Sequence, residues 1–152
     1  MLSRMAENLY WLSRYTERAE NLARILGVAQ RLAALPSTYA GASNEWESAI
    51  MTASCEVDFK AKYDKATRDN VIRFLVGTDG YEGSIIACIE TARANARAVR
   101  TAITTEMWEI INDAWNDMQR VRVDHLSETE LDRFLSSVKE MSLRFDGAAY
   151  RT

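Results

Sequence analysis

The sequence predicts an all-α fold, in which about five or six helices joined by short loops form an antiparallel bundle. One proline and six glycines among 152 residues leave few positions that break a helix. Apolar residues recur at helical spacing in the longer segments, and no segment alternates apolar and polar residues as a half-buried strand does. A chain of this length can bury one hydrophobic core, so we expect a single domain over residues 1–152.

The first two helices have clear boundary signals. A long helix is expected over residues 2–35, because Pro36 and the loop-forming stretch PSTYAGAS follow it. Asn44 and Glu47 have the spacing of a capping box, which predicts a short helix that ends near Ser54. The next stretch, CEVDFKAKYDK, has no lasting period and receives no assignment.

Two further helices begin at hydroxyl side chains. Thr67 is the expected N-cap of a helix of about ten residues that stops at Gly77. After the turn TDGYEG, Ser84 is the expected N-cap of a helix of roughly twenty residues, IIACIETARANARAVRTAI.

The last two helices are defined in the same way. Thr104 or Thr105 opens the segment EMWEIINDAWNDMQRV. Ser127 and Glu130 form a second capping box, which opens the segment ETELDRFLSSVKEMSLRFDGAAY.

The first helix carries one polar stripe. Because successive residues turn by about 100°, one set of mostly charged side chains falls within an arc of about 100°: Glu7, Tyr10, Arg14, Glu17, Arg18 and Asn21. Apolar residues occupy the other side, and Asn8, which projects among them, is expected in the core with a hydrogen-bond partner. The stripe is open to three interpretations: a solvated face with local ion pairs, a polar network between helices, or a binding face.

A second charged cluster lies in the stretch ETARANARAVR, residues 90–100. Arg93, Arg97 and Arg100 share a face within an arc of roughly 60°, with Glu90 beside them. This stripe is either solvated, or an arginine fork for carboxylates or phosphates, or one side of a seam with the first helix. The sharpest hypothesis is that Glu17 bridges to Arg97 or Arg93.

Other chemistry is sparse. His125 is the only histidine and is expected at the surface or at a helix cap, so we expect no metal and no cofactor. Cys88 is expected to be a small buried hydrophobe. The tryptophans are expected to be core anchors: Trp11, Trp46, Trp108 and Trp115.

Composition also sets the surroundings that we expect. A net charge of −3 gives no basic field that would attract nucleic acid. The sequence has no run of 18 apolar residues, so we expect no membrane span. Charged residues interrupt the N-terminal segment early, so we expect no signal peptide. Two cysteines in a domain of this size are typical of reduced thiols in the cytoplasm.

Taken in order, the two charged clusters resemble the bacterial Alpha-E family, an all-helical family marked by a Glu-Arg motif in its first helix. The matching stretches are MLSRMAENLYWLSRYTERAENLARIL, with Glu17-Arg18 as the pair, SIIACIETARANARAVRTAITTEMWEIIND and FDGAAYRT. The family usually has an Asn-Pro pair where this chain has YEGS. Its members are roughly twice as long, so this chain resembles an N-terminal half or a short version, and we expect a homo-oligomer that covers the missing part.

The resemblance implies a context. Members of the family are encoded beside, or fused to, circularly permuted ATP-grasp proteins and transglutaminase-like peptidases. We therefore expect an accessory helical protein of a peptide ligation or modification system, which binds the ATP-grasp protein or its peptide substrate. The alternatives are an enzyme whose pocket is lined by Glu17, Arg18, Arg93 and Arg97, and a purely structural bundle.

Overall fold

The computed structural model describes residues 2–36, 44–77, 79–121 and 126–151, and these fold into seven α-helices. Their bounds are α1 Leu2–Ala34, α2 Glu45–Thr52, α3 Glu56–Lys62, α4 Arg68–Val76, α5 Ile85–Ala98, α6 Thr105–Met118 and α7 Glu128–Tyr150. The described residues contain no strand, which confirms the all-α prediction.

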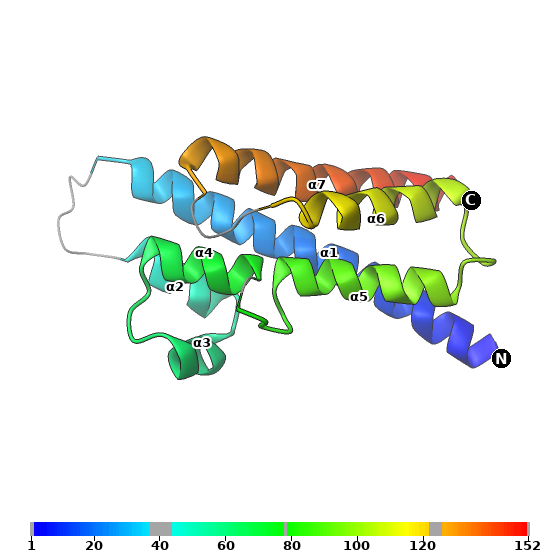
Figure 1. The fold of residues 1–152 in the computed structure, drawn as a ribbon, viewed down its shortest axis with the longest axis horizontal. Helices are drawn as coiled ribbons and strands as arrows, with labels where there is room; N and C mark the ends of the chain where they lie inside the picture. Colours follow the sequence, from blue (N-terminus) through cyan, green and yellow to red (C-terminus); the bar gives the residue numbers. More distant parts are fainter. Residues whose placement is uncertain (1, 37–43, 78, 122–125, 152) are drawn as a thin grey trace.

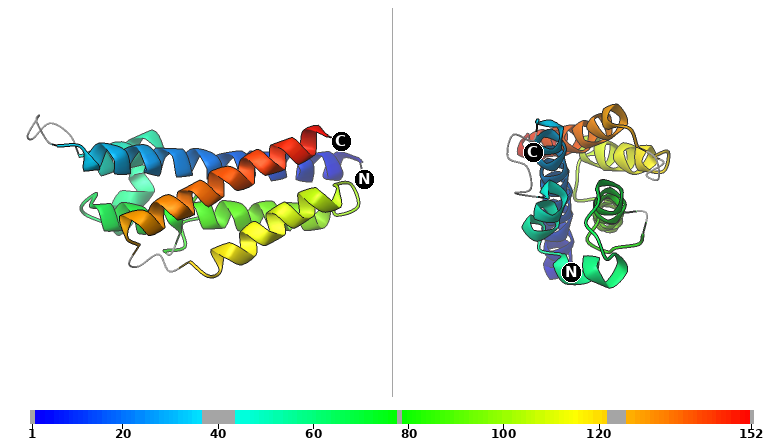
Figure 2. Two further views of the ribbon diagram at one scale, coloured as in Figure 1. Left: turned by 90° about the horizontal axis from the view of Figure 1, so that it is seen from above. Right: turned by 90° about the vertical axis from the view of Figure 1, so that its left-hand side faces the viewer.

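Four helices form the body of the molecule. Each of α1, α5, α6 and α7 packs against two of the others, and neighbours run in opposite directions (Figure 1). The most extensive of these contacts is between α1 and α5. The expected antiparallel bundle is therefore correct, with α1 on one side and α6 on the other (Figure 2).

The three short helices cover one end of the bundle. α2 packs on α1, and α4 packs on α2 and α5. The side chains of the expected N-caps accept hydrogen bonds from backbone amides at the starts of five helices, as the sequence predicts: Asn44, Thr67, Ser84, Thr104 and Ser127. Gly77 ends α4 with a φ of 126°, a conformation that a side chain rarely adopts.

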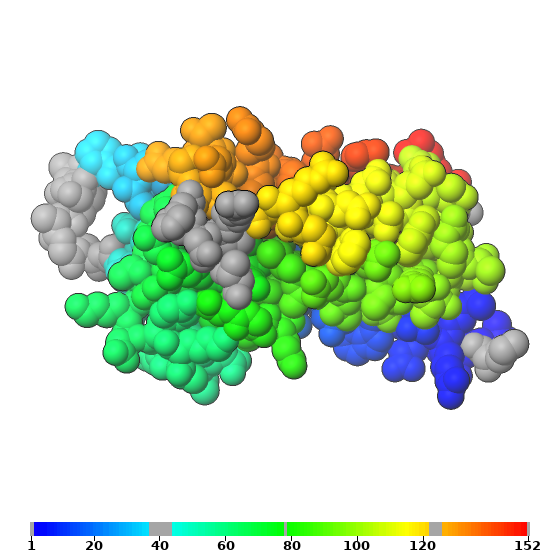
Figure 3. Space-filling view, in the orientation of Figure 1, coloured from blue at the N-terminus to red at the C-terminus, as the bar shows by residue number. Residues whose placement is uncertain are grey.

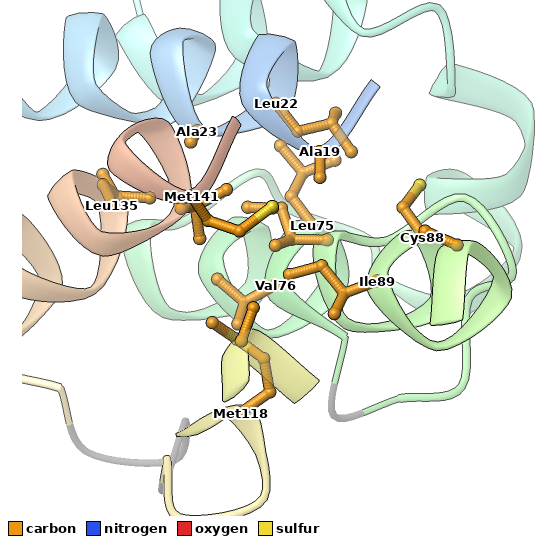
Figure 4. Close-up of a cluster of buried hydrophobic side chains, with 14 of the residues drawn as sticks. Ala19, Leu22, Ala23, Leu75, Val76, Cys88, Ile89, Met118, Leu135 and Met141 are labelled. Carbon is orange, nitrogen blue, oxygen red and sulfur yellow. The ribbon is translucent and has the colours of Figure 1, made fainter. Parts of the chain in front are cut away.

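The core lies between α1, α4, α5, α6 and α7. Its apolar side chains come from every one of these helices, for example Ala19, Leu75, Ile89, Met118 and Leu135 (Figure 4). Small residues on α1 let the neighbouring helices approach closely, and Ala19 and Ala23 are fully buried. The polar stripe of α1 points away from this core.

One polar contact joins helices distant in sequence. Buried Gln30 on α1 donates from Nε2 to Asp132 Oδ1 at 2.7 Å and to the carbonyl oxygen of Glu128 at 3.2 Å. It fixes the start of α7 against the end of α1.

Some details differ from the sequence-based expectations. The unassigned stretch forms α3, with Phe59 buried. α5 ends at Ala98 instead of running through the following turn. Asn8 is half-buried and donates to the carbonyl oxygen of Arg4 in its own helix, so its expected place in the core is wrong. The expected surface position or cap at His125 lies outside the described residues.

Of the expected aromatic anchors, only Trp46 is fully buried. Trp11 is 42% exposed, and Trp108 and Trp115 are half-buried against the core. The expected core position is therefore correct for Trp46 and wrong for Trp11, whereas Trp108 and Trp115 pack only partly against the core.

Candidate functional site

The polar stripe of α1 is open to solvent. The side chains of Arg14 and Glu17 are each 57% exposed, and Arg14 Nη1 donates to Glu17 Oε2 at 3.2 Å. One turn further, Arg24 Nη2 donates to Glu20 Oε1 at 3.1 Å. The Arg14–Glu17 pair is typical of a solvated helix face and stabilises the helix by only a few tenths of a kcal/mol, whereas the side chain of Glu20 is only 17% exposed.

A shallow hollow of about 220 Å³ opens in the middle of this stripe. Its wall is made by six side chains of α1: Trp11, Arg14, Tyr15, Glu17, Arg18 and Asn21. The ring centroids of Trp11 and Tyr15 are 5.8 Å apart, so two aromatic side chains stand next to the charged ones. The hollow thus combines guanidinium and amide donors, a carboxylate and apolar ring surface.

The charge of Arg18 acts on two groups at and near the start of α5, Cys88 and Tyr81. Burial raises the pKa of the Cys88 thiol to about 11, and the positive charge of Arg18 acts in the opposite direction. The same charge acts on Tyr81, whose pKa is raised mainly by burial. Cys55 also has a pKa raised to about 11, first by burial and then by Asp58 and Glu56. Both thiols are therefore protonated at neutral pH, which makes them poor nucleophiles.

On its other side the stripe approaches α7. Asp146 is exposed, and its pKa is raised, first by the loss of some hydration next to neighbouring side chains and then by the negative charges of Glu20 and Glu17. The acidic side chains of α1 therefore share a local field with a carboxyl group of α7.

The arginine stripe of α5 faces a different helix. Arg93 Nε donates to Asn112 Oδ1 on α6 at 2.9 Å, and its guanidinium carbon lies 4.2 Å from the ring centroid of Trp115. Arg93 and Arg100 lie 5.7 Å and 5.6 Å from the ring centroid of Trp108. Both arginines are half-buried by these contacts, and Arg97 between them is exposed.

The expected bridge from Glu17 to Arg97 or Arg93 is wrong. Glu17 pairs with Arg14 in its own helix, and Arg93 turns toward α6. The antiparallel packing of α1 and α5 fits this separation. The charge of Arg18 acts on Cys88, and Arg97 lies nine residues further along α5, about two and a half helical turns toward the N-terminal end of α1. The structure therefore does not bring the two charged clusters together into one seam.

The remaining predicted site residues are open to water. Glu7 and Glu90 are exposed, as are Arg18 and Asn21. Sequence reasoning missed the roles of Trp11 and Tyr15 beside the Glu-Arg pair, and of Asn112 and Trp115 beside Arg93. The spacing of Trp108 and Trp115, seven residues apart on one helix face, was the available signal, but it was assigned to the core.

Comparison with protein families gives one match over the whole chain. Residues 1–152 match the model of the Alpha-E family, described as "a predicted alpha-helical domain with a conserved ER motif". The chain belongs to the Alpha-E family. No curated protein and no solved structure matches it.

The sequence contains one Glu-Arg dipeptide, Glu17-Arg18, which lies in the middle of α1 and in the wall of the hollow. Within the described residues, no three histidine, cysteine, aspartate or glutamate side chains are grouped as metal ligands would be. No helix of the same residues combines the length and the apolar character that a membrane span requires.

Proposed function

We propose that this Alpha-E domain is a non-catalytic accessory protein that binds a partner through the polar stripe of α1. The proposed partner is a circularly permuted ATP-grasp protein or its peptide substrate, in a peptide ligation or modification system. The observation that carries the proposal is the position of Glu17 and Arg18. Both are open to water and line a hollow beside Trp11 and Tyr15.

The chemistry of the hollow suits a polypeptide. Arg18 and Asn21 offer N–H donors to carbonyl or carboxylate oxygens, and Glu17 offers an acceptor to backbone amides. Trp11, 42% exposed, supplies rigid apolar area next to these groups. Tryptophan and arginine are among the residues that most often dominate protein–protein binding energies.

The geometry supports binding more than catalysis. The enzymatic alternative needs Glu17, Arg18, Arg93 and Arg97 around one pocket. In the structure, Glu17 pairs with Arg14 on its own helix, whereas Arg93 turns away from α1 and contacts α6. Glu17 is 57% exposed, and both described thiols are held protonated by burial. A desolvated pocket, which strengthens the electrostatic interactions used in catalysis, is not formed by these groups.

The test uses a purified, circularly permuted ATP-grasp protein, the class of partner proposed here. Binding is measured by calorimetry for the wild type, for Glu17→Gln with Arg18→Gln, and for a matched control, Glu140→Gln with Arg144→Gln on exposed α7 positions. The α1 double variant should weaken binding at least about tenfold, since two charge-assisted contacts are lost. Equal binding by all three proteins, or no binding by the wild type, would overturn the proposal.

A further inference from the structure

Arginines of α5 and of the turn after it lie against tryptophans of α6, with Arg93 over Trp115 and Arg100 over Trp108. Figure 3 shows α5 and α6 next to each other on the face turned to the viewer. We propose that this Arg–Trp face, defined by Arg93, Arg97, Arg100, Trp108 and Trp115, is a docking site for an acidic helix of a partner protein. It lies on the α6 side of the bundle, away from α1 (Figure 2). Its occupancy is therefore independent of the α1 binding surface.

The first step in the argument is the number of free donors. A guanidinium carries five N–H groups in a planar fork. Arg93 uses its Nε on Asn112, and within the described residues its two terminal nitrogens have no hydrogen-bond partner. Arg97 and Arg100 have no hydrogen-bond or ion-pair partner in the same part of the chain. Three forks are thus available to oxyanions on one face.

The second step is preorganisation. Two of the three guanidiniums are held against indole rings, at 4.2 Å for Arg93 on Trp115 and 5.6 Å for Arg100 on Trp108. A cation over an aromatic face keeps its N–H edges directed outward, where they can meet an anion. Because these side chains are already ordered, binding costs less conformational entropy than it would with free arginines.

The third step is register. Arg93 and Arg97 are spaced i, i+4 on α5, about 6 Å apart along its axis at 1.5 Å per residue, and Arg100 lies in the turn that follows the end of α5. Glutamates at i and i+4 of a partner helix present two carboxylates at the spacing of Arg93 and Arg97, and a glutamate at i+7 continues the row toward Arg100. Glu90 is the one acidic residue on this stripe and lies at its N-terminal end, so the stripe keeps a net positive charge. The geometry thus favours an acidic helix over a single small anion.

A simpler interpretation is that these contacts only fasten α5 to α6. Arg93 with Asn112 and Trp115 is sufficient for that purpose. Arg97 adds nothing to it, because it is exposed and touches neither tryptophan. Arg97 is therefore the residue whose removal separates docking from fastening.

The test is a fluorescence titration of the full chain with a labelled, alanine-rich helical peptide that carries glutamates at i, i+4 and i+7. Three comparison ligands are used: the same peptide with glutamines, an isomer with its three glutamates spread around the helix, and inorganic pyrophosphate. The protein variants are Arg97→Gln and a matched control, Arg144→Gln, which removes an exposed arginine from α7.

We expect the striped peptide to bind, and Arg97→Gln to weaken it about tenfold or more. Arg144→Gln should change the affinity by less than about twofold, and rising salt should weaken binding. Three results would each overturn the proposal. The isomer could bind as tightly as the striped peptide, Arg144→Gln could weaken binding of the striped peptide as much as Arg97→Gln does, or the protein could bind pyrophosphate but not the striped peptide. None of these outcomes depends on the α1 surface, so they are distinguishable from failure of the proposed function.

Discussion

The guanidinium of Arg93 lies over the ring of Trp115, with 4.2 Å between the guanidinium carbon and the ring centroid, while its Nε donates to Asn112. One arginine thus joins α5 to α6 by both a cation–π contact and a hydrogen bond. The pair is half-buried, so water screens it less than it screens the ion pairs of α1.

We predict that Arg93→Met lowers the free energy of unfolding by about 1–2 kcal/mol, since it removes the cation and leaves Asn112 without its donor. Urea denaturation of Arg93→Met, Trp115→Leu and the double variant measures the coupling between them. The double variant should lose less than the sum of the single losses. Strict additivity would show that the two side chains do not interact.

The exposed charges of Glu17 on α1 and Arg97 on α5 should contribute little to stability. We predict that Glu17→Ala and Arg97→Ala each lower the free energy of unfolding by no more than about 1 kcal/mol, because Glu17 pairs with Arg14 in water and Arg97 is exposed. The effects should add in the double variant, as they do for residues that are not in contact. A coupling energy above about 1 kcal/mol in denaturant melts would show that Glu17 and Arg97 interact between α1 and α5.

Asp146 makes stability depend on pH. Its pKa is raised in the folded state by the loss of some hydration and by the charges of Glu20 and Glu17, so folding favours the protonated form. Stability is lost as the pH rises from below the ordinary value of 3.8 through the raised folded-state pKa, and the penalty persists at pH 7.

Asp146→Asn should therefore stabilise the protein at pH 7. Because Asp146 is exposed, solvent screening limits the gain to a few tenths of a kcal/mol. The gain should disappear near pH 3, where the carboxyl is protonated in both states. Thermal melts at both pH values measure it, with Asp113→Asn on α6 as the control. A larger gain at pH 3 than at pH 7 would contradict the assigned sign.

Gly77 and Gly80 form a matched pair of glycines. Both have a positive φ, 126° and 75°, so an alanine strains the backbone at either position. A Cβ at Gly77 would also clash with the Ser84 hydroxyl, whereas a Cβ at Gly80 meets nothing within 4 Å. We predict that Gly77→Ala lowers the free energy of unfolding by at least about 1 kcal/mol more than Gly80→Ala, measured by urea denaturation. Equal losses would mean that the turn relaxes freely.

Sequence reasoning succeeded where the signal is local. The N-caps at Asn44, Thr67 and Ser84 are correct, because a short polar side chain before an apolar period acts on amides within three residues of itself. The end of α5 was missed, because Val99 and Ile103 are buried and continue the apolar period through a turn that contains neither glycine nor proline.

The candidate site was less accessible to prediction. Helical angles placed Arg93, Arg97 and Arg100 on one face, but α5 ends before Arg100, and angles on one helix do not reveal which neighbour lies alongside. That neighbour is α6 for Arg93, and the partner is an indole ring instead of a carboxylate. Pairing charges by sign alone therefore pointed to the wrong helix.

The hydrogen bond between Gln30 and Asp132 joins residues 102 positions apart. At a synthesis rate of about 5–20 residues per second, the ribosome needs roughly 5–20 s to make the chain between them. During that time α1 has been made, but the α7 side of its apolar face has no partner. The helix that organises the finished bundle is thus also the segment that nascent-chain chaperones have the longest opportunity to bind.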